Sequence, residues 1–265
     1  MGSRWRTSLT HIEPNRILVR GYPLDETMGR VSFGDTIHLL LTGDLPTPSI
    51  SRLVDAMLVS FIDHGATPPS TLATRNAATT GASLRGAVAA GILGFGRHHG
   101  GDILACRQWL DDGLALTRAG EPLSGAVKVL ADRFAESGDP FPPGFGHRYH
   151  ARDPRAARLL QMALELDLDG VHTQLLRAVA HELQTHAAFV GRALPVNIDG
   201  AIAAVSADAG LSPEVADAVL LISRVPGLAA HALEEQEREA PMRAIDPVAH
   251  EYDGPQERRV PVSRK

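Results

Sequence analysis

The stretch that decides the fold runs from residue 143 to residue 155 and reads Pro143-Gly144-Phe145-Gly146-His147-Arg148-Tyr149-His150-Ala151-Arg152-Asp153-Pro154-Arg155. Its two glycines permit positive φ angles and a close approach of the backbone to a ligand. Its Asp-Pro pair suits the cap and the first position of a helix, and apolar residues at helical spacing follow. We therefore expect His147 on a glycine-rich loop near a helix N-terminus, among three arginines, where an anionic substrate and a proton-transferring side chain fit.

The composition of the 265-residue chain is that of a soluble protein with a sizeable core, with 44% hydrophobic residues. Aromatic residues are sparse at 5%, while alanine and leucine are abundant, which favours helices. A net charge of −5 without a basic stripe argues against a nucleic-acid-binding protein. With one cysteine, no apolar segment typical of a signal peptide and no apolar run of 18 residues, we expect a cytoplasmic protein that neither forms an internal disulfide nor contacts a membrane.

The pattern along the chain predicts a mainly α-helical fold with one short β-hairpin at the N-terminus. The hairpin is expected to pair Ser8–Ile12 with Ile17–Val19. The helix at Leu84–Gly94 is small and apolar throughout, so we expect it to be buried, and we expect residues 213–223 and 227–238 to form two separate helices. The other predicted helices cover residues 33–42, 49–63, 70–80, 102–118, 123–137, 154–166, 171–190 and 201–208.

Three histidines and one carboxylate in loops are the candidate chemistry of this chain. A carboxylate moves a proton on carbon, one histidine donates to an enolate oxygen, and a second handles the proton of a carbonyl or hydroxyl. A planar guanidinium binds a carboxylate through two hydrogen bonds. Any single histidine is more often structural, and Asp199 alone fits a helix cap. The candidates are His64, His99, His147 and Asp199, with Arg155, Arg224 and Arg243 as carboxylate clamps.

A metal site is the main competing interpretation of a chain with twelve histidines. His98 and His99 are adjacent, and their side chains point apart in most backbones. His181 and His186 are five residues apart, whereas two ligands on one helix face are four apart. We therefore expect no metal, and the lone glycine pair at Gly94 and Gly96 follows no predicted strand, which argues against a dinucleotide site.

Eight short stretches in one order along the chain resemble the citrate synthase superfamily, which includes citrate synthases and the citryl-CoA lyase module of ATP-citrate lyase. The loop at residues 144–155 resembles the Gly-Phe-Gly-His…Asp-Pro-Arg signature of that family. The other stretches are Arg20-Gly21-Tyr22-Pro23-Leu24, Leu39 to Thr47, Asp63-His64, Ser70-Thr71, His99-Gly100-Gly101, Asn197-Ile198-Asp199-Gly200, and Ser223-Arg224 with His231.

The resemblance implies a helical fold with a large domain, at about residues 1–120 and 196–265, and a small domain at about 121–195. It implies a homodimer or higher homo-oligomer, with the site between the domains. By that resemblance His99 stabilises an acetyl-CoA enolate, Asp199 exchanges the α-proton and His147 acts on the oxaloacetate carbonyl. Carboxylates would be held by His64, Arg155, Arg224 and, less closely, Arg243, because Ala244 replaces the usual proline; Gly144, Phe145 and Gly146 would line the coenzyme A site.

One departure from full citrate synthases favours a particular reaction. Only residues 48–62 lie between the Leu-Pro-Thr turn and Asp63, where citrate synthases have a longer helical segment. The citryl-CoA lyase module is shortened in the same way, although its position equivalent to His99 is not histidine. We therefore expect a citryl-CoA lyase that uses the coenzyme A thioester as substrate and no tightly bound cofactor, with a citryl-CoA synthetase as a possible partner. The alternatives are a short citrate synthase or related acyltransferase, and a non-catalytic subunit that binds coenzyme A.

Overall fold

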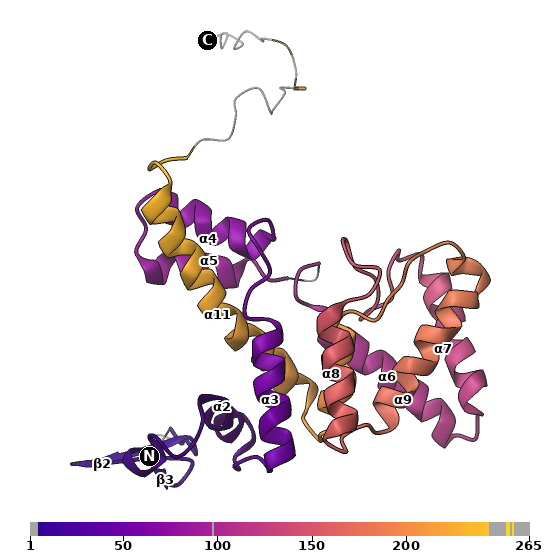
Figure 1. Ribbon diagram of the computed structural model, residues 1–265, viewed down its shortest axis with the longest axis horizontal. Coiled ribbons are helices and arrows are strands. Elements are labelled where there is room, and N and C mark those ends of the chain that lie inside the picture. The colour runs from indigo at the N-terminus through magenta and orange to yellow at the C-terminus, as the bar shows by residue number, and fades with distance from the viewer. Residues whose placement is uncertain (1–4, 97, 244–252, 255, 257–265) are drawn as a thin grey trace, which may run out of the picture.

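A computed structural model describes residues 5–96, 98–243, 253–254 and 256, and it is mainly helical (Figure 1). A small antiparallel sheet precedes the helices, as the sequence predicts. The strands are β1 (Thr10–Glu13), β2 (Arg16–Val19) and β3 (Tyr22–Pro23); the helices are α1 (Leu24–Thr27), α2 (Phe33–Thr42), α3 (Pro48–Ser60), α4 (Pro69–Thr79), α5 (Leu84–Leu93), α6 (Asp102–Arg118), α7 (Leu123–Ser137), α8 (Pro154–Glu165), α9 (Val171–Thr185), the 3₁₀ turn η1 (Ala187–Phe189), α10 (Ile198–Asp208) and α11 (Pro213–Arg238).

The sheet has one more strand than the predicted hairpin. β1 and β2 pair with Glu13 opposite Arg16, and β2 continues to pair with β3, with Leu18 opposite Pro23. Arg20 takes a positive φ of 48° and Gly21 one of 89°, which turns the chain back instead of ending the sheet. The Arg20 guanidinium then donates to the carbonyl of Leu40 at 2.8 Å, which attaches the sheet to α2.

Helix starts follow the capping residues that the sequence supplies. Ser32, Thr47, Ser83 and Ser212 each accept a hydrogen bond from a first-turn amide of α2, α3, α5 and α11. Asp153 accepts from the amide of Arg155 and begins α8, as expected from its Asp-Pro sequence. These caps explain why most predicted helices begin within a few residues of their observed starts.

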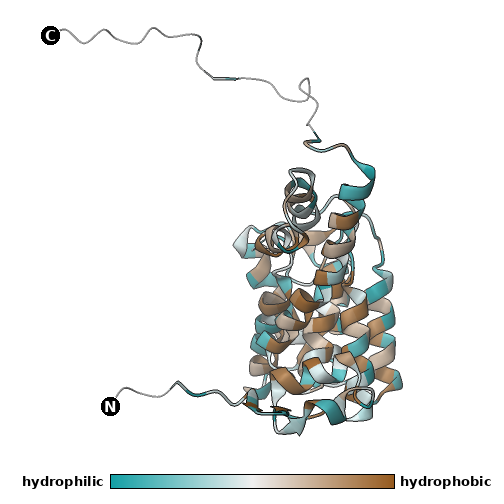
Figure 2. Cartoon of the chain, turned by 90° about the vertical axis from the view of Figure 1, so that its left-hand side faces the viewer, coloured by the Kyte–Doolittle hydropathy of each residue, from teal (hydrophilic) through white to brown (hydrophobic). Residues whose placement is uncertain are grey.

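The helices form two groups that share α11. In Figure 1, α4 and α5 lie side by side against the C-terminal half of α11, while α2 and α3 lie beside its N-terminal half. The second group contains α6 to α10, in which α10 packs against α6, α8 and α9. Brown and teal residues alternate along the helices in Figure 2, as expected for helices that bury one face. The core contains Leu53, Met57, Ile103, Leu110, Leu176, Ile202 and Leu220 among its buried residues.

Residues 213–238 form one helix rather than the two that we predicted. Pro226 lies inside α11 without ending it. A proline removes one backbone hydrogen bond, but packing on both faces compensates for that loss here, since α11 contacts α2, α3, α4, α5, α6 and α10. Among the described helices, only α11 is long and apolar enough to cross a membrane. Buried core helices also meet these two criteria, and α11 is a core helix.

Two other helices differ from their predictions. The expectation of a buried helix at 84–94 is wrong within this chain, because α5 buries only Ala87 and Gly91 while Leu93 is 85% exposed. Its small residues allow close packing on α4 and α11, but no described element covers the rest of its surface. α9 ends at Thr185 instead of residue 190, because His186 leaves the helical conformation and its side chain caps the turn η1.

Candidate active site

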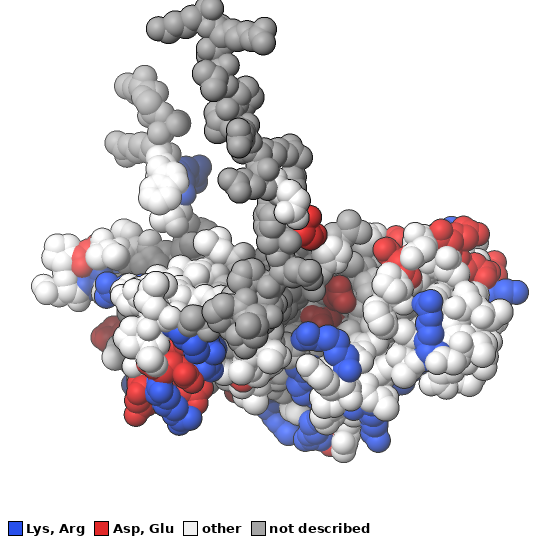
Figure 3. Space-filling view, turned by 90° about the horizontal axis from the view of Figure 1, so that it is seen from above, with Lys and Arg blue, Asp and Glu red and all other residues white. Residues whose placement is uncertain are grey.

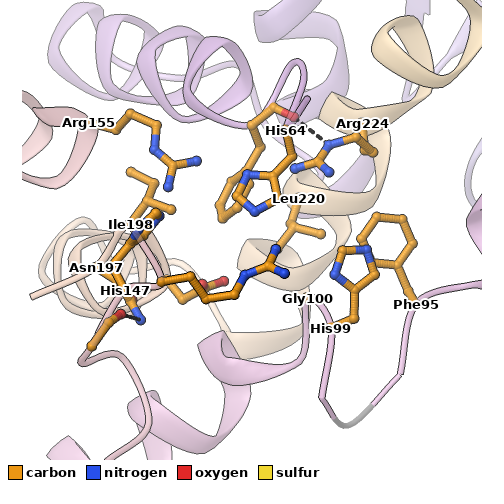
Figure 4. A pocket seen from close by; sticks show the side chains of 14 residues that line it. His64, Phe95, His99, Gly100, His147, Arg155, Asn197, Ile198, Leu220 and Arg224 are labelled. Carbon is orange, nitrogen blue, oxygen red and sulfur yellow. Dashed lines mark hydrogen bonds between the residues drawn. The ribbon is translucent and has the colours of Figure 1, made fainter. Parts of the chain in front are cut away.

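A cavity of about 180 Å³ lies where α3, α10 and α11 meet the two glycine-rich loops. It brings together residues that are up to 163 positions apart, since both Phe61 and Arg224 line it. Figure 4 shows the three histidines and the arginines around one space, with Asn197 and Ile198 on the wall contributed by α10. The candidates that line the cavity are His64, His99, His147, Arg155, Asp199 and Arg224.

The His64 imidazole is held in its neutral form. Burial and the positive charges of Arg224 and Arg155 lower its pKa to about 4. It follows the Asp63 turn, in which the Asp63 carboxylate accepts from the amide of Gly65 at 2.9 Å. A neutral imidazole next to two guanidinium groups can accept one hydrogen bond and donate another. The two positive charges beside it favour the binding of a carboxylate.

Arg224 provides a buried positive charge on α11. The residue is 2% exposed, and its Nε donates to the carbonyl of Phe61 at 2.8 Å. Its guanidinium lies over the rings of Phe61 and Phe95, 5.9 Å from each centroid. Nη1 is buried and has no hydrogen-bond partner among the described residues. An unpaired buried guanidinium nitrogen is costly, so this atom is well placed to bind an anionic ligand.

Arg155 reaches the same space from the start of α8. Its Nε and Nη2 donate to both oxygens of Asp153 at 3.0 and 2.9 Å. Asp153 is 1% exposed and also accepts from the amide of Ile198 at 3.1 Å, which joins the N-termini of α8 and α10. This ion pair and the arginine amide lower the pKa of Asp153 below its usual range despite burial. The pair therefore fixes the position of the Arg155 guanidinium at the cavity wall.

His99 is oriented by Ser70, the second residue of α4. The Ser70 amide donates to Nε2 at 3.4 Å, and its hydroxyl lies 2.8 Å from the same nitrogen. We therefore assign Nε2 as the acceptor, so the neutral ring carries its proton on Nδ1. Burial and the charge of Arg224 lower the pKa of His99, which favours this neutral form. The ring stacks on Phe95 at 4.9 Å, which leaves Nδ1–H as the donor for a ligand.

His147 is fixed by the loop that follows it. The amides of Tyr149 and His150 both donate to its Nδ1, at 3.0 and 3.1 Å. The neutral ring therefore carries its proton on Nε2, which is the nitrogen left for a ligand. Burial and the neighbouring His150 lower the pKa of His147, so the imidazole is neutral near pH 7.

Asp199 stands in the first turn of α10, and its Oδ1 is buried without a hydrogen-bond partner among the described residues. Burial and the negative charge of Asp102 raise its pKa to about 7. Asn197 provides the helix cap, since its side chain accepts from the amide of Gly200 at 3.0 Å. Asp199 is therefore not used as a cap, and a carboxyl with a pKa near 7 can both give and take a proton under ordinary conditions.

Comparison with known proteins places this chain in a family. The family model described as "Citrate synthase, C-terminal domain" matches residues 46–245. Citryl-CoA lyase from Hydrogenobacter thermophilus is 38% identical, covers 97% of both chains and superimposes with a TM-score of 0.86. The chain belongs to the citrate synthase family. Its fold is the citrate-synthase-like fold that the resemblance implied, and the prediction of family and fold class is confirmed.

Other members of the citrate synthase family are more distant. A citrate synthase from Heyndrickxia coagulans is 27% identical over 213 residues, and this chain spans 53% of its length. The citrate synthase from Pyrobaculum aerophilum is 26% identical with a TM-score of 0.67. ATP citrate lyase from Methanosaeta concilii, solved in complex with citryl-CoA, shares the fold at 18% identity and a TM-score of 0.81, and this chain covers 43% of it.

Not every predicted site residue of this citrate synthase family member lies at the cavity. Arg243 lies five residues beyond the end of α11, where its Nε donates to the buried carboxylate of Glu235 at 2.8 Å, away from the cavity lining. Gly146 lines the cavity, whereas Phe145 is 2% exposed and its ring packs edge-on against Trp109. Gly144 lies behind the lining, with its carbonyl accepting from the Asn197 amide at 3.0 Å.

Some functional candidates were missed by the sequence argument. Asn197 holds the loop through its Nδ2, which donates to the carbonyl of Gly146 at 3.2 Å. Ser70 orients His99. Arg148 was expected near His147 but not named as a site residue, and it lines the cavity beside Arg155. The Asn-Ile-Asp-Gly stretch provided a signal for Asn197, while nothing local in the sequence connects Ser70 with His99, 29 positions away.

The charges in this part of the molecule fit a small anion better than a metal ion or a nucleic acid. Within the described residues there is no cluster of three or more histidine, cysteine, aspartate or glutamate side chains that could hold a metal ion. On the described surface seen in Figure 3, blue side chains gather at the lower centre, red ones gather at the upper right, and both are mixed at the lower left. At the cavity the positive charge comes from Arg148, Arg155 and Arg224.

Proposed function

We propose that this protein is a citryl-CoA lyase that cleaves citryl-CoA to acetyl-CoA and oxaloacetate. The observation that carries this proposal is the convergence of Asp199, with a pKa near 7, and the neutral His99 and His147 on one arginine-lined cavity. The similarity to citryl-CoA lyase from Hydrogenobacter thermophilus along 97% of both chains supports the same reaction. The chain is, more generally, an enzyme of the citrate synthase and citryl-CoA lyase superfamily.

The roles of the three residues follow from the protons that they hold. In condensation, the carboxylate of Asp199 takes a proton from the methyl of acetyl-CoA, and Nδ1–H of His99 donates to the enolate oxygen. The enolate carbon then bonds to the carbonyl carbon of oxaloacetate, and the resulting alkoxide accepts a hydrogen bond from Nε2–H of His147 before it takes a proton from solvent. Cleavage is the reverse: the hydroxyl of citryl-CoA loses its proton to solvent while Nε2–H of His147 donates to the alkoxide, the carbon–carbon bond breaks, and the acid form of Asp199 protonates the enolate carbon.

The substrate is expected to be held by cations and by backbone. Arg155, Arg224 and His64 would bind carboxylates, and the backbone of the Gly144–Gly146 turn would contact coenzyme A, with the Phe145 ring serving to anchor the turn in the core. Citrate and coenzyme A accompany another ATP citrate lyase, from Methanothrix soehngenii, in its solved structure. The reaction of the thioester needs no tightly bound cofactor, because proton transfer by Asp199, exchange of the hydroxyl proton with solvent and the hydrogen bonds donated by His99 and His147 account for each bond that forms or breaks.

A citrate synthase activity is the second candidate. The relative from Heyndrickxia coagulans is a citrate synthase, and this chain keeps a histidine at position 99. The same residues serve condensation and cleavage, so the two candidates differ in whether the thioester of citryl-CoA is also hydrolysed. The short segment between the Leu-Pro-Thr turn and Asp63, residues 48–62, consists mostly of α3 and favours the lyase, because less structure is available to close over the thioester.

We also propose that the protein works as a homodimer, with a separate synthetase as the source of citryl-CoA. The exposed apolar face of α5, with Leu93 at 85% and Leu84 at 39% exposure, supports an interface between two copies. A face of small and apolar residues permits close helix packing across such an interface.

The deciding experiment supplies the purified protein with citryl-CoA and follows oxaloacetate with malate dehydrogenase and NADH. Acetyl-CoA plus oxaloacetate is tested in parallel with a free-thiol reagent. Oxaloacetate release without free coenzyme A is the expected result for a lyase. Free coenzyme A from the condensation mixture would establish a synthase instead, and no product in either assay would refute both candidates.

A further inference from the structure

Asp63 and His231 both belong to stretches that resemble the citrate synthase family, and the structure brings them into contact. Nε2 of His231 lies 3.0 Å from Oδ1 of Asp63, although the two residues are 168 positions apart. A carboxylate accepts and does not donate, so the imidazole carries its proton on Nε2 and donates it. The His231 side chain is only 14% exposed. The contact therefore joins the buried side of α11 to the residue directly before His64.

The two oxygens of Asp63 have different partners. While Oδ1 accepts from α11, Oδ2 accepts from the amide of Gly65 at 2.9 Å, which closes a turn with His64 as its middle residue. Gly65 has a φ of 83°, a left-handed conformation that glycine adopts without strain. His64 is therefore held inside a turn whose acidic side chain is itself held by α11.

The helix also contacts the backbone that leads into this turn. Nε of Arg224 donates to the carbonyl of Phe61 at 2.8 Å. A Cβ atom on Gly227 would lie 2.3 Å from the carbonyl oxygen of Ile62 and 3.0 Å from Oδ1 of Asp63, so helix and loop meet with no side chain between them. α11 thus follows the chain from residue 61 to residue 63 and contacts each residue on the way.

We propose that His231 is a positioning residue, which holds the Asp63–Gly65 turn and thereby places His64 at the cavity. His64 lines both the cavity of the proposed reaction and an adjoining cavity of about 270 Å³, whereas His231 lines neither. His231 therefore acts on a ligand only through the turn. This inference rests on the proposed function, in which His64 holds a carboxylate of oxaloacetate.

Release of the turn has a specific consequence for the site. Burial and the charges of Arg224 and Arg155 lower the pKa of His64 to about 4, which requires that the imidazole stays buried near both guanidinium groups. Without the hydrogen bond from His231 the turn can move, and the imidazole then no longer shares a carboxylate with these cations. The residues that transfer protons stand on other elements and keep their positions, so KM is expected to change more than kcat.

Two variants of the full-length protein test the inference. His231→Phe keeps a ring without a donor, whereas His231→Gln keeps a donor. Oxaloacetate binding, measured by calorimetry, should weaken about tenfold in His231→Phe and stay within about twofold of wild type in His231→Gln, because only the first loses a hydrogen bond to a charged group. His181→Phe changes an exposed histidine of α9 that lines neither cavity, and this control is expected to bind like wild type.

Nitrogen-15 NMR of the histidine side chains provides a readout that a loss of stability alone does not change. The His64 resonances are identified by their loss in His64→Gln. The His64 imidazole should stay neutral from pH 5 to pH 8 in wild type and in His231→Gln, and it should titrate within that range in His231→Phe. A His64 imidazole that stays neutral in His231→Phe would overturn the inference, as would equal effects of the two His231 variants.

A variant on the other side of the contact keeps the inference open to refutation if His231→Phe does not fold. The hydroxyl of Asp63→Ser can still accept from the Gly65 amide, but the oxygen beside His231 is lost. A His64 titration and an oxaloacetate affinity equal to those of wild type in Asp63→Ser would contradict the tether. If wild-type protein does not cleave citryl-CoA, the proposed function fails, while the His64 titration still decides whether His231 positions the imidazole.

Discussion

Replacing Asp199 with asparagine is expected to stabilise the protein at neutral pH and to abolish turnover. The carboxyl has a pKa of about 7 in the folded chain, against 3.8 for an ordinary aspartate. This difference corresponds to at most about 4 kcal/mol of folding free energy lost above pH 7, at about 1.36 kcal/mol per pKa unit. Because part of Asp199 faces the open cavity, we expect roughly half of that, about 2 kcal/mol.

The sign of this effect depends on pH in a defined way. The folded state binds the proton of Asp199 more tightly than the unfolded state, so the penalty is absent below pH 3.8 and grows as the pH rises to 7. For a chain of this length, a gain of about 2 kcal/mol raises Tm by roughly 4–8 °C. Asp199→Asn is therefore expected to gain that much at pH 8 and less than half as much at pH 5.

Calorimetric scans at the two pH values measure this difference, with Asp112→Asn as the control that removes an exposed charge. An equal gain at pH 5 and pH 8 would mean that the ionisation of Asp199 is not its source. A loss of stability at both values would refute the reasoning, because it would show that the carboxylate is well compensated in the folded state.

Four further predictions follow from the described contacts. Exchange of the acetyl-CoA methyl protons into D₂O, with malate in place of oxaloacetate, should rise about tenfold from pH 6 to pH 8 as Asp199 ionises, and a flat profile would contradict its role. His99→Ala should lower kcat by roughly 10²–10³, whereas a change under about threefold would make His99 structural. Asp208→Asn should cost about 2 kcal/mol above pH 4, because His172 and Thr173 hold the pKa of Asp208 to about 2; denaturant titrations should show this gap closing as the pH falls from 4 to 2. Leu93→Glu should shift the protein from dimer to monomer in light scattering, and an unchanged mass would place the interface elsewhere.

Local signals in the sequence were sufficient for most of the secondary structure. Ser32 and Gly43 mark the ends of α2, Gly101 and Gly120 flank α6, and the observed bounds of both helices equal the predicted ones. The third strand was missed because Arg20 takes a left-handed conformation, which a β-prone sequence pattern does not indicate. The burial of α5 was misjudged because small apolar residues indicate close packing but do not indicate whether the partner helix belongs to the same chain.

The site was predictable only in part, for a physical reason. His99, His147 and Asp199 each stand beside glycine-rich turns that can be read locally, and the structure brings all three to one cavity. The position of Arg243 depends on Glu235, a carboxylate that is distant from any turn. Its side chain is fully buried and needs positive partners, which are the Nε atoms of Arg75 and Arg243 at 2.7 and 2.8 Å from its oxygens. Such long-range charge compensation leaves no periodic trace in a sequence.

The continuity of α11 through Pro226 has a direct consequence for the site. Arg224, Gly227 and His231 lie at i, i+3 and i+7, so one face of the helix presents all three. Arg224 donates to the carbonyl of Phe61, and a Cβ atom on Gly227 would lie 2.3 Å from the carbonyl oxygen of Ile62. Two separate helices would not hold these positions in register.

The same face of α11 also fixes the loop that carries His64. His231 Nε2 lies 3.0 Å from the carboxylate of Asp63, which in turn accepts from the amide of Gly65. The segment from Phe61 to Gly65 is therefore attached to α11 at two places. Before Pro226, Arg224 donates to the Phe61 carbonyl; after Pro226, His231 contacts the Asp63 carboxylate. Because Arg224 is on the same helix, the distance between the guanidinium and the His64 imidazole is set by one rigid element, and this proximity contributes to the low pKa of His64. A break at Pro226 would therefore separate the anion-binding charge from the neutral histidine beside it.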